Sequence, residues 1–304
     1  MPAKSNLTNL INCKAITKQP LLLPSCGQAD ISVDVLRLDL IHPVISGNKF
    51  FKLKVAIQNA LSSDIKGIVS FGGAYSNHLV ALACLCNAVG LQSIGVIRGE
   101  EPAKHSPALN DAIGYGMNPV FVNRELYGNK KQLNSLFHQQ YPGFKLIPEG
   151  GQSAEGVEGA TEILCIADCS AYDVIVCAVG TGTMMAGLSK GASDHQELLG
   201  ISSLKIGPGN DIEKFINLHT RRPFSILYNY HFGGYAKKSS ELIDFMNQLW
   251  RDHQLPTDFV YTAKLIFAIN DLAEKKHFRP GTRILAIHSG GLQGNRSIAD
   301  KLIF

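Results

Sequence analysis

Short apolar segments alternate with helical segments along most of this chain, and the alternation limits the folds that it can adopt. Apolar runs at 67–71, 174–178 and 283–287 end at glycine or small polar residues, and helical segments separate them. Such runs are typical of parallel strands covered by helices on both faces. The sequence therefore predicts an α/β fold with parallel-rich, twisted sheets flanked by helices, and ligands beyond the carboxyl ends of the strands.

The pattern is regular enough to place most elements. Strands are expected at 33–40, 67–71, 93–97, 119–122, 145–148, 174–178, 198–202 and 283–287. Helices are expected at 50–61, 77–89, 107–113, 130–140, 155–167, 184–190, 239–250 and 263–276. The pattern predicts no regular order between 208 and 234.

Composition excludes several classes of function. With 304 residues, 45% of them hydrophobic and 18% charged, the chain can bury a sizeable core. The formal net charge is only +4 and no basic run occurs, so a nucleic-acid surface is not indicated. The seven cysteines have no zinc spacing, so we expect buried thiols in a reducing compartment and no metal site. No signal segment or membrane span is evident, so we expect a cytoplasmic protein.

Two lysines, Lys49 and Lys52, lie three residues apart where the first expected helix begins, behind the turn Ser46-Gly47. Residues at i and i+3 share a helix face, so both amines point to one region. A lysine amine can form a Schiff base with a carbonyl, and a second cation lowers its pKa and holds an anion. The alternative is a solvated basic face, because most lysines are exposed.

Three strands are followed by glycine and small hydroxyl residues. After 67–71 come Ser76 and Asn77; Ser76 is either a helix N-cap or a hydroxyl held beside a ligand. After 174–178 comes Gly180-Thr181-Gly182-Thr183, where backbone N–H groups, a helix dipole and hydroxyls favour one phosphate group, although a plain tight turn is the alternative. The P-loop lysine and a nucleotide glycine spacing are absent.

The third such segment is His288-Ser289-Gly290-Gly291. Ser289 can hydrogen-bond a ring nitrogen, or it is a turn residue only. A lysine nucleophile, a single-phosphate cradle and polar strand ends together fit pyridoxal phosphate, which needs a Schiff-base lysine, a phosphate cup and a group that tunes its pyridine nitrogen.

At this point the chain resembles a known family, the fold-type II pyridoxal-phosphate enzymes of tryptophan synthase β-like fold. The branch is that of D-cysteine desulfhydrase and 1-aminocyclopropane-1-carboxylate (ACC) deaminase. The resemblance runs from about residue 36 to 291, and its motifs are weak singly but specific in this order. They are Gly47-Asn48-Lys49-x-x-Lys52-Leu53, Gly73-x-x-Ser76-Asn77-His78, the Gly180–Thr183 loop, Val260-Tyr261-Thr262 and His288-x-Gly290-Gly291.

The resemblance implies roles for the cofactor-binding residues. Lys49 matches the lysine that forms the Schiff base and moves protons, and Lys52 matches a second lysine near the cofactor phosphate. Asn77 matches the residue bonded to the phenolic oxygen, and the 180–183 loop matches the phosphate site. Ser289 stands beside the pyridine nitrogen in this scheme.

The resemblance also implies substrate-binding and catalytic residues. Ser76, Asn77 and His78 border the substrate carboxylate, and Ser76 is the candidate hydroxyl catalyst. Tyr261 matches an aromatic residue beside the cofactor ring, and Tyr235 resembles a second active-site tyrosine.

The family implies two domains and usually a homodimer. We expect a larger cofactor-binding domain from 1–51 and 161–304, and a smaller α/β domain from 52–160.

Two positions favour one member of the branch. The deaminases carry glutamate and leucine where this chain has Thr262 and Ser289, and desulfhydrase-like members carry small hydroxyl residues there. A hydroxyl favours protonation of the pyridine nitrogen less than a carboxylate does. Both positions favour β-elimination from D-cysteine, giving pyruvate, ammonia and hydrogen sulfide.

Other functions stay open. The chain departs from the family pattern at Phe50-Phe51, at Ala74-Tyr75 and at Leu292, so the pocket and its amino acid can differ. The alternatives are ACC deamination to 2-oxobutanoate and ammonia, elimination from an amino acid such as D-serine, and a catalytically silent member that binds cofactor in a regulatory role. No nucleic-acid or membrane partner is expected.

Overall fold

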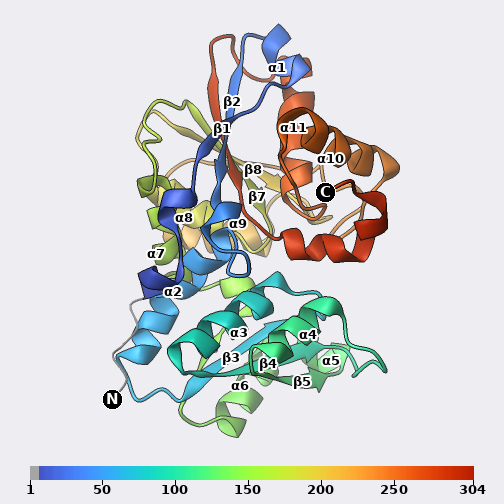
Figure 1. Ribbon diagram of the computed structural model, residues 1–304. Helices are drawn as coiled ribbons and strands as arrows, with labels where there is room; N and C mark the ends of the chain where they lie inside the picture. The colour runs from blue at the N-terminus through green and yellow to red at the C-terminus, as the bar shows by residue number, and fades with distance from the viewer. Residues whose placement is uncertain (1–6) are drawn as a thin grey trace.

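The strands form two separate sheets in the computed structural model, which describes residues 7–304 (Figure 1). The larger sheet has the order β1-β2-β10-β7-β8-β9 and the smaller one β5-β4-β3-β6. All neighbours are parallel except β1 and β2. The strands are β1 Lys18–Pro20, β2 Ser32–Arg37, β3 Gly67–Gly72, β4 Gln92–Arg98, β5 Met117–Val122, β6 Phe144–Ile147, β7 Val174–Val179, β8 Glu197–Ser202, β9 Ser225–Leu227 and β10 Arg283–His288.

Helices cover both sheets, as the alternating sequence predicts (Figure 1). The α-helices are α1 Pro24–Gln28, α2 Asn48–Leu61, α3 Asn77–Val89, α4 Pro107–Gly114, α5 Arg124–Gly128, α6 Lys130–Gln140, α7 Ala154–Thr161, α8 Thr183–Gly191, α9 Asp211–His219, α10 Ser240–His253 and α11 Thr262–Glu274. The 3-10 helices are η1 Leu7–Leu10, η2 Cys13–Ala15, η3 Leu38–Ile41, η4 Glu149–Gly151, η5 Glu162–Cys165 and η6 Leu292–Lys301. The α/β fold class is therefore confirmed.

The central strands of the larger sheet are buried on both faces. In β7, Ile175 and Cys177 belong to one hydrophobic core, whereas Val174 and Val176 belong to another on the opposite face. Successive side chains of a strand point to opposite faces, so two covered faces require an unbroken apolar run. This is the physical reason for the apolar sequence at 174–178.

Helices α2, α7 and α8 pack against one another beside the two sheets. Glycines allow the close approach: a Cβ on Gly159 would lie 2.0 Å from the Phe51 carbonyl oxygen, and one on Gly187 would lie 2.4 Å from Ala160 Cβ. The proposed boundary between 51 and 52 falls inside α2, and the boundary at 160/161 falls at the end of α7. Residues 1–6 of the proposed larger domain lie outside the described part, and the division stays a prediction.

The structure differs from the predicted elements in a few places. The strand expected at 33–40 ends at Arg37, because the chain turns into η3, and the helix expected at 155–167 ends at Thr161 and continues as η5. The unassigned stretch 208–234 contains α9 and β9. No helix within residues 7–304 is long and apolar enough to cross a membrane.

Candidate active site

The start of α2 lies directly against the end of β10. Gly47 has φ +66°, and a Cβ at this position would lie 1.9 Å from the Ser289 carbonyl oxygen. The Asn48 N–H donates to the same oxygen at 3.2 Å. Only glycine combines this conformation with so close an approach. The contact brings Lys49 beside Ser289, although 240 residues separate them in the sequence.

The Lys49 amine is partly buried and held by its neighbour. Its Nζ donates to Asn48 Oδ1 at 2.6 Å, and Asn48 Nδ2 contacts Met184 Sδ at 3.2 Å. Burial lowers the pKa of Lys49 to about 8, while the carboxylate of Asp258 favours the charged form. A substantial neutral fraction near pH 8 is what a lysine nucleophile needs.

Lys52 lies further inside, with 7% of the residue exposed. Its Nζ is 3.3 Å from the Gly150 carbonyl oxygen and 3.5 Å from Thr181 Oγ1. Burial and then the charge of Lys49 lower the pKa of Lys52 to about 7. The two amines therefore face one region, as their spacing predicts, and Lys52 points to the 180–183 loop.

The 180–183 loop forms a compact turn at the N-terminus of α8. Gly182 is the N-cap with φ +82°, and Thr181 Oγ1 lies 3.0 Å from Thr183 Oγ1. Gln152 Nε2 donates to the Thr181 carbonyl oxygen at 2.9 Å and fixes the turn from outside. The first N–H groups of a helix have no acceptor within the helix, so hydroxyls, N–H groups and the Lys52 amine converge where an anion can bind.

Ser76 and Asn77 lie at the N-terminus of α3. Ser76 is the N-cap, and its Oγ accepts a hydrogen bond from the Leu79 N–H at 3.3 Å. Asn77 Nδ2 donates to the Gly291 carbonyl oxygen at 3.1 Å and so joins the β3 end to the β10 end. Its Oδ1 is buried without a hydrogen-bond partner. A buried polar atom without a partner is costly and indicates a site for a ligand.

His78 is buried and electrically neutral. Its Nε2 lies 2.9 Å from Ser70 Oγ, and that hydroxyl donates to the Ile147 carbonyl oxygen at 2.8 Å. Nε2 therefore carries the proton, and Nδ1 presents a buried lone pair without a partner. Burial, and then the charges of Lys49 and Lys52, lower the pKa of His78 to about 3. Such a ring accepts a hydrogen bond, so it suits a donor better than a carboxylate.

Two tyrosines form the side of the site contributed by the larger sheet. Tyr261 precedes α11, and its ring fills the space in front of Gly180, where a Cβ would lie 3.1 Å from Tyr261 Cε1. The Tyr235 ring is 6.2 Å away at an interplanar angle of 67°, and this residue is 51% exposed. Burial, and then Tyr235, raise the pKa of Tyr261, which therefore stays protonated.

Asp258 is a residue of the site that the sequence reasoning missed. It is 1% exposed, and its carboxylate accepts the N–H groups of Val260, Tyr261 and Thr262 at 3.0, 2.9 and 2.9 Å. It thereby caps α11 and fixes the tyrosine. The pair Gly150-Gly151 after β6 was also missed, although two glycines after an apolar strand are a signal of the kind used elsewhere in the chain.

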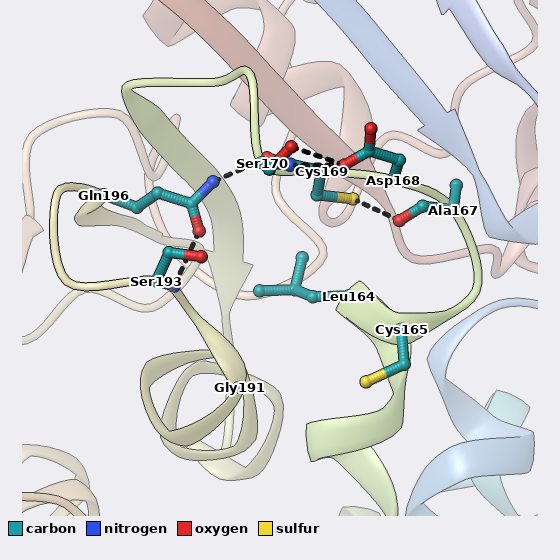
Figure 2. A pocket seen from close by; sticks show the side chains of 9 residues that line it. All are labelled: Leu164, Cys165, Ala167, Asp168, Cys169, Ser170, Gly191, Ser193 and Gln196. Carbon is teal, nitrogen blue, oxygen red and sulfur yellow. Dashed lines mark hydrogen bonds between the residues drawn. The ribbon is translucent and has the colours of Figure 1, made fainter.

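A separate pocket of about 270 Å³ lies at the far end of α8, about 13 Å along the helix from the 180–183 turn (Figure 2). Cys165 and Cys169 are on one side of it, and Gln196 closes the other, donating to the Cys169 carbonyl oxygen at 2.6 Å. It contains none of the predicted site residues.

The residues at the candidate site fit pyridoxal phosphate. Lys49 offers an amine of lowered pKa, and Lys52 with the 180–183 turn offers a cationic cradle for one phosphate. The unpartnered Asn77 Oδ1 and His78 Nδ1 are polar atoms that a polar ligand can satisfy. Ser289, which is 4% exposed, follows the strand whose end adjoins Lys49.

Comparison with known proteins agrees with a pyridoxal-phosphate site. The family model for pyridoxal-phosphate dependent enzymes matches residues 15–290. A Pyrococcus horikoshii protein named as a candidate ACC deaminase is 30% identical over 301 residues, which are 92% of this chain and 91% of that protein. The mitochondrial bifunctional D-cysteine desulfhydrase/ACC deaminase of Arabidopsis thaliana is 27% identical over 303 residues, which are 88% of this chain and 74% of that protein.

A solved structure agrees over the whole length. The crystal structure of an ACC deaminase homologue has a TM-score of 0.80 at 25% identity, covering 99% of both chains. The family model, over residues 15–290, includes every strand of both sheets. The chain therefore belongs to the fold-type II family of pyridoxal-phosphate dependent enzymes, in the group that includes ACC deaminase and D-cysteine desulfhydrase.

Proposed function

We propose that this protein is a lyase that converts D-cysteine and water to pyruvate, ammonia and hydrogen sulfide. The observation that carries the proposal is the type of group available to the pyridine nitrogen of the cofactor. Ser289 lies beside the start of α2, where its carbonyl oxygen accepts the Asn48 N–H, and Thr262 stands where the deaminases carry glutamate. The Thr262 hydroxyl is buried without a partner.

Within the described residues, the buried carboxylates near this segment, Asp258 and Asp39, are already engaged. Asp258 accepts three backbone N–H groups, while Asp39 accepts hydrogen bonds from Arg37 and lies 3.3 Å from His288 Nδ1. A hydroxyl partner leaves the pyridine nitrogen less protonated and the cofactor a weaker electron sink. A weaker sink suits loss of an α-proton followed by a good thiolate leaving group better than it suits opening of a ring that has no α-hydrogen.

The residues of the site have separate roles in the proposed reaction. Pyridoxal phosphate held by these residues would supply an electron sink for the substrate α-carbon. Lys49, whose pKa is about 8, accepts the α-proton as a general base. The 180–183 turn and Lys52 hold the phosphate, and Ser76 with Asn77 orients the substrate carboxylate. The C–S bond breaks with the electron pair leaving on sulfur, and the thiolate takes up a proton to leave as hydrogen sulfide.

ACC deamination is the second candidate, because the Pyrococcus relative is named as a candidate ACC deaminase and the solved structure is titled an ACC deaminase homologue. A silent regulatory member is less well supported, since Lys49, Ser76 and Asn77 are all retained and a protein that only binds the cofactor would not need all three. We also infer a cytoplasmic homodimer from the family, which sedimentation velocity and cell fractionation test.

The test is product formation by the protein reconstituted with pyridoxal phosphate. We expect sulfide and pyruvate from D-cysteine, much less from L-cysteine, and no 2-oxobutanoate from ACC. Lys49→Ala should abolish turnover, whereas Lys54→Ala, on the same helix but paired with Glu162 at 2.5 Å, should retain it. 2-Oxobutanoate from ACC with no sulfide from D-cysteine would refute the proposal in favour of the second candidate.

A further inference from the structure

Lys264 is a buried lysine in the first turn of α11, and the chemistry proposed above does not use it. It is 1% exposed, and its Nζ donates to two backbone carbonyl oxygens, those of His231 at 2.8 Å and Gly234 at 3.0 Å. Burial lowers the pKa of Lys264 to about 8. Burying an ammonium group costs its hydration, so the hydrogen bonds to the His231 and Gly234 carbonyl oxygens must offset that cost.

The two carbonyls occupy equivalent places in two consecutive turns. The His231 carbonyl accepts the Gly234 N–H at 3.0 Å and closes the first turn. The Gly234 carbonyl accepts the Lys237 N–H at 3.1 Å and closes the second. The Lys264 ammonium group therefore binds the oxygen that closes each turn, and Tyr235 is the first central residue of the second turn.

The backbone of these turns is strained. Phe232 and Ala236 have φ of 51° and 53°, in the left-handed region that residues other than glycine seldom adopt. Strain of this kind persists only where surrounding contacts hold it. Besides Lys264, the ring of Phe232 packs edge-on against Phe267 of α11 at 5.0 Å. Both contacts fasten the loop to the same helix.

Helix α11 also places the other tyrosine. Tyr261 is the N-cap of α11, three residues before Lys264. Asp258 fixes the N-terminus of α11 beside Tyr261, while Lys264 fixes the 231–237 loop one turn further on. The two tyrosine rings are 6.2 Å apart as a result.

We propose that Lys264 is a positioning residue, which clamps the 231–237 loop so that Tyr235 stands beside Tyr261 in the active site. This rests on the proposed function only in taking Tyr235 as an active-site residue. The clamp itself is a property of the loop, and it can be measured without turnover.

The first experiment is hydrogen exchange of the cofactor-loaded enzyme. Lys264→Met keeps the length of the side chain but loses the donors, and we expect the Gly234 and Lys237 amides to exchange about tenfold faster, with β7 and β10 unchanged. Lys275→Met is the matched control, because Lys275 is an exposed lysine at the C-cap of α11 and pairs with Asp271. If Lys264→Met does not fold, Lys264→Gln takes its place. Unchanged loop exchange, or an equal increase over the whole chain, would overturn the proposal.

The second experiment is a double-mutant cycle with Tyr235→Phe. If Lys264 acts through Tyr235, each single variant lowers kcat/KM and the double variant is within about twofold of the poorer single. Multiplication of the two effects would show that Lys264 does not act through the tyrosine. If Tyr235→Phe alone changes nothing, the assignment of Tyr235 to the active site fails, while the exchange result still decides the clamp.

Discussion

Lys52→Met removes the ammonium group that we assign to the cofactor phosphate. The consequence can be measured as a change in the number of protons taken up when the phosphate ligand binds. Burial, together with the charge of Lys49, lowers the pKa of Lys52 to about 7 in the ligand-free site. A phosphate dianion beside the amine favours its charged form and raises that pKa. Ligand binding above pH 7 must therefore take up a proton at Lys52.

The size of the uptake follows from the pKa. A group of pKa about 7 is about 10% neutral at pH 6, about 50% neutral at pH 7 and about 90% neutral at pH 8. If the bound phosphate keeps Lys52 fully charged, uptake grows from about 0.1 to about 0.9 proton over this range. Lys49 adds protons at higher pH, because its pKa is about 8. The difference between the wild type and Lys52→Met isolates the share of Lys52.

The assay is titration calorimetry with 4′-deoxypyridoxine 5′-phosphate, which lacks the aldehyde and cannot form a Schiff base with Lys49. The binding heat in buffers of different ionisation enthalpy gives the number of protons taken up. Lys54→Met, outside the site, should behave as the wild type. If the variant binds too weakly to titrate, the pH profile of the wild type decides. An uptake that is constant or falls from pH 6 to pH 8 would refute the reasoning.

Three further predictions concern the frame of the site. Gly182→Ala should lower the free energy of unfolding, measured by urea denaturation, by about 1–2 kcal/mol, because φ is +82° and the new Cβ would lie 2.9 Å from a side-chain carbon of α9. Gly207→Ala is the control: its Cβ would meet nothing within 4 Å, so the variant should have little effect. Asp258→Ala should cost about 2–4 kcal/mol in the same assay, since three buried N–H groups lose their acceptor; a loss below about 1 kcal/mol would contradict the capping role. Ser289→Ala should lower kcat for D-cysteine about tenfold or more, whereas Thr262→Val should leave kcat unchanged. Equal effects of the two substitutions would contradict the assignment of Ser289 to the pyridine nitrogen.

The elements that local signals define could be predicted from the sequence. Helix α3 begins and ends where the sequence predicts, because the Ser76 hydroxyl caps it and Gly90 adopts φ 76° at its end. The end of β2 could not be predicted, because the apolar pattern continues into η3. There the chain leaves the sheet, and Asp39 forms a buried ion pair with Arg37 at 2.6 Å, a contact that alternation does not reveal.

Some residues of the candidate site could likewise be predicted from sequence motifs, whereas others could not. Lys49, Ser76 and Ser289 follow short motifs at strand and helix ends, and parallel sheets bring such ends together. Asp258 and Lys264 have no such signal, since the first acts through three N–H groups of its own turn and the second through carbonyls 30 and 33 residues away. In the sequence, Lys264 is only one more helical lysine. Its burial depends on how a strained loop folds back on α11.

The charges of the site explain why two lysines are needed rather than one. Without an anion, burial lowers the pKa of Lys49 to about 8, and burial followed by the charge of Lys49 lowers the pKa of Lys52 to about 7. A phosphate on Lys52 offsets the charge there. The carboxylate of Asp258 favours the charged form of Lys49, but burial outweighs it. Lys52 can therefore stay charged as the anion site while Lys49 remains neutral enough to act as a nucleophile and base, a division that a single lysine could not provide.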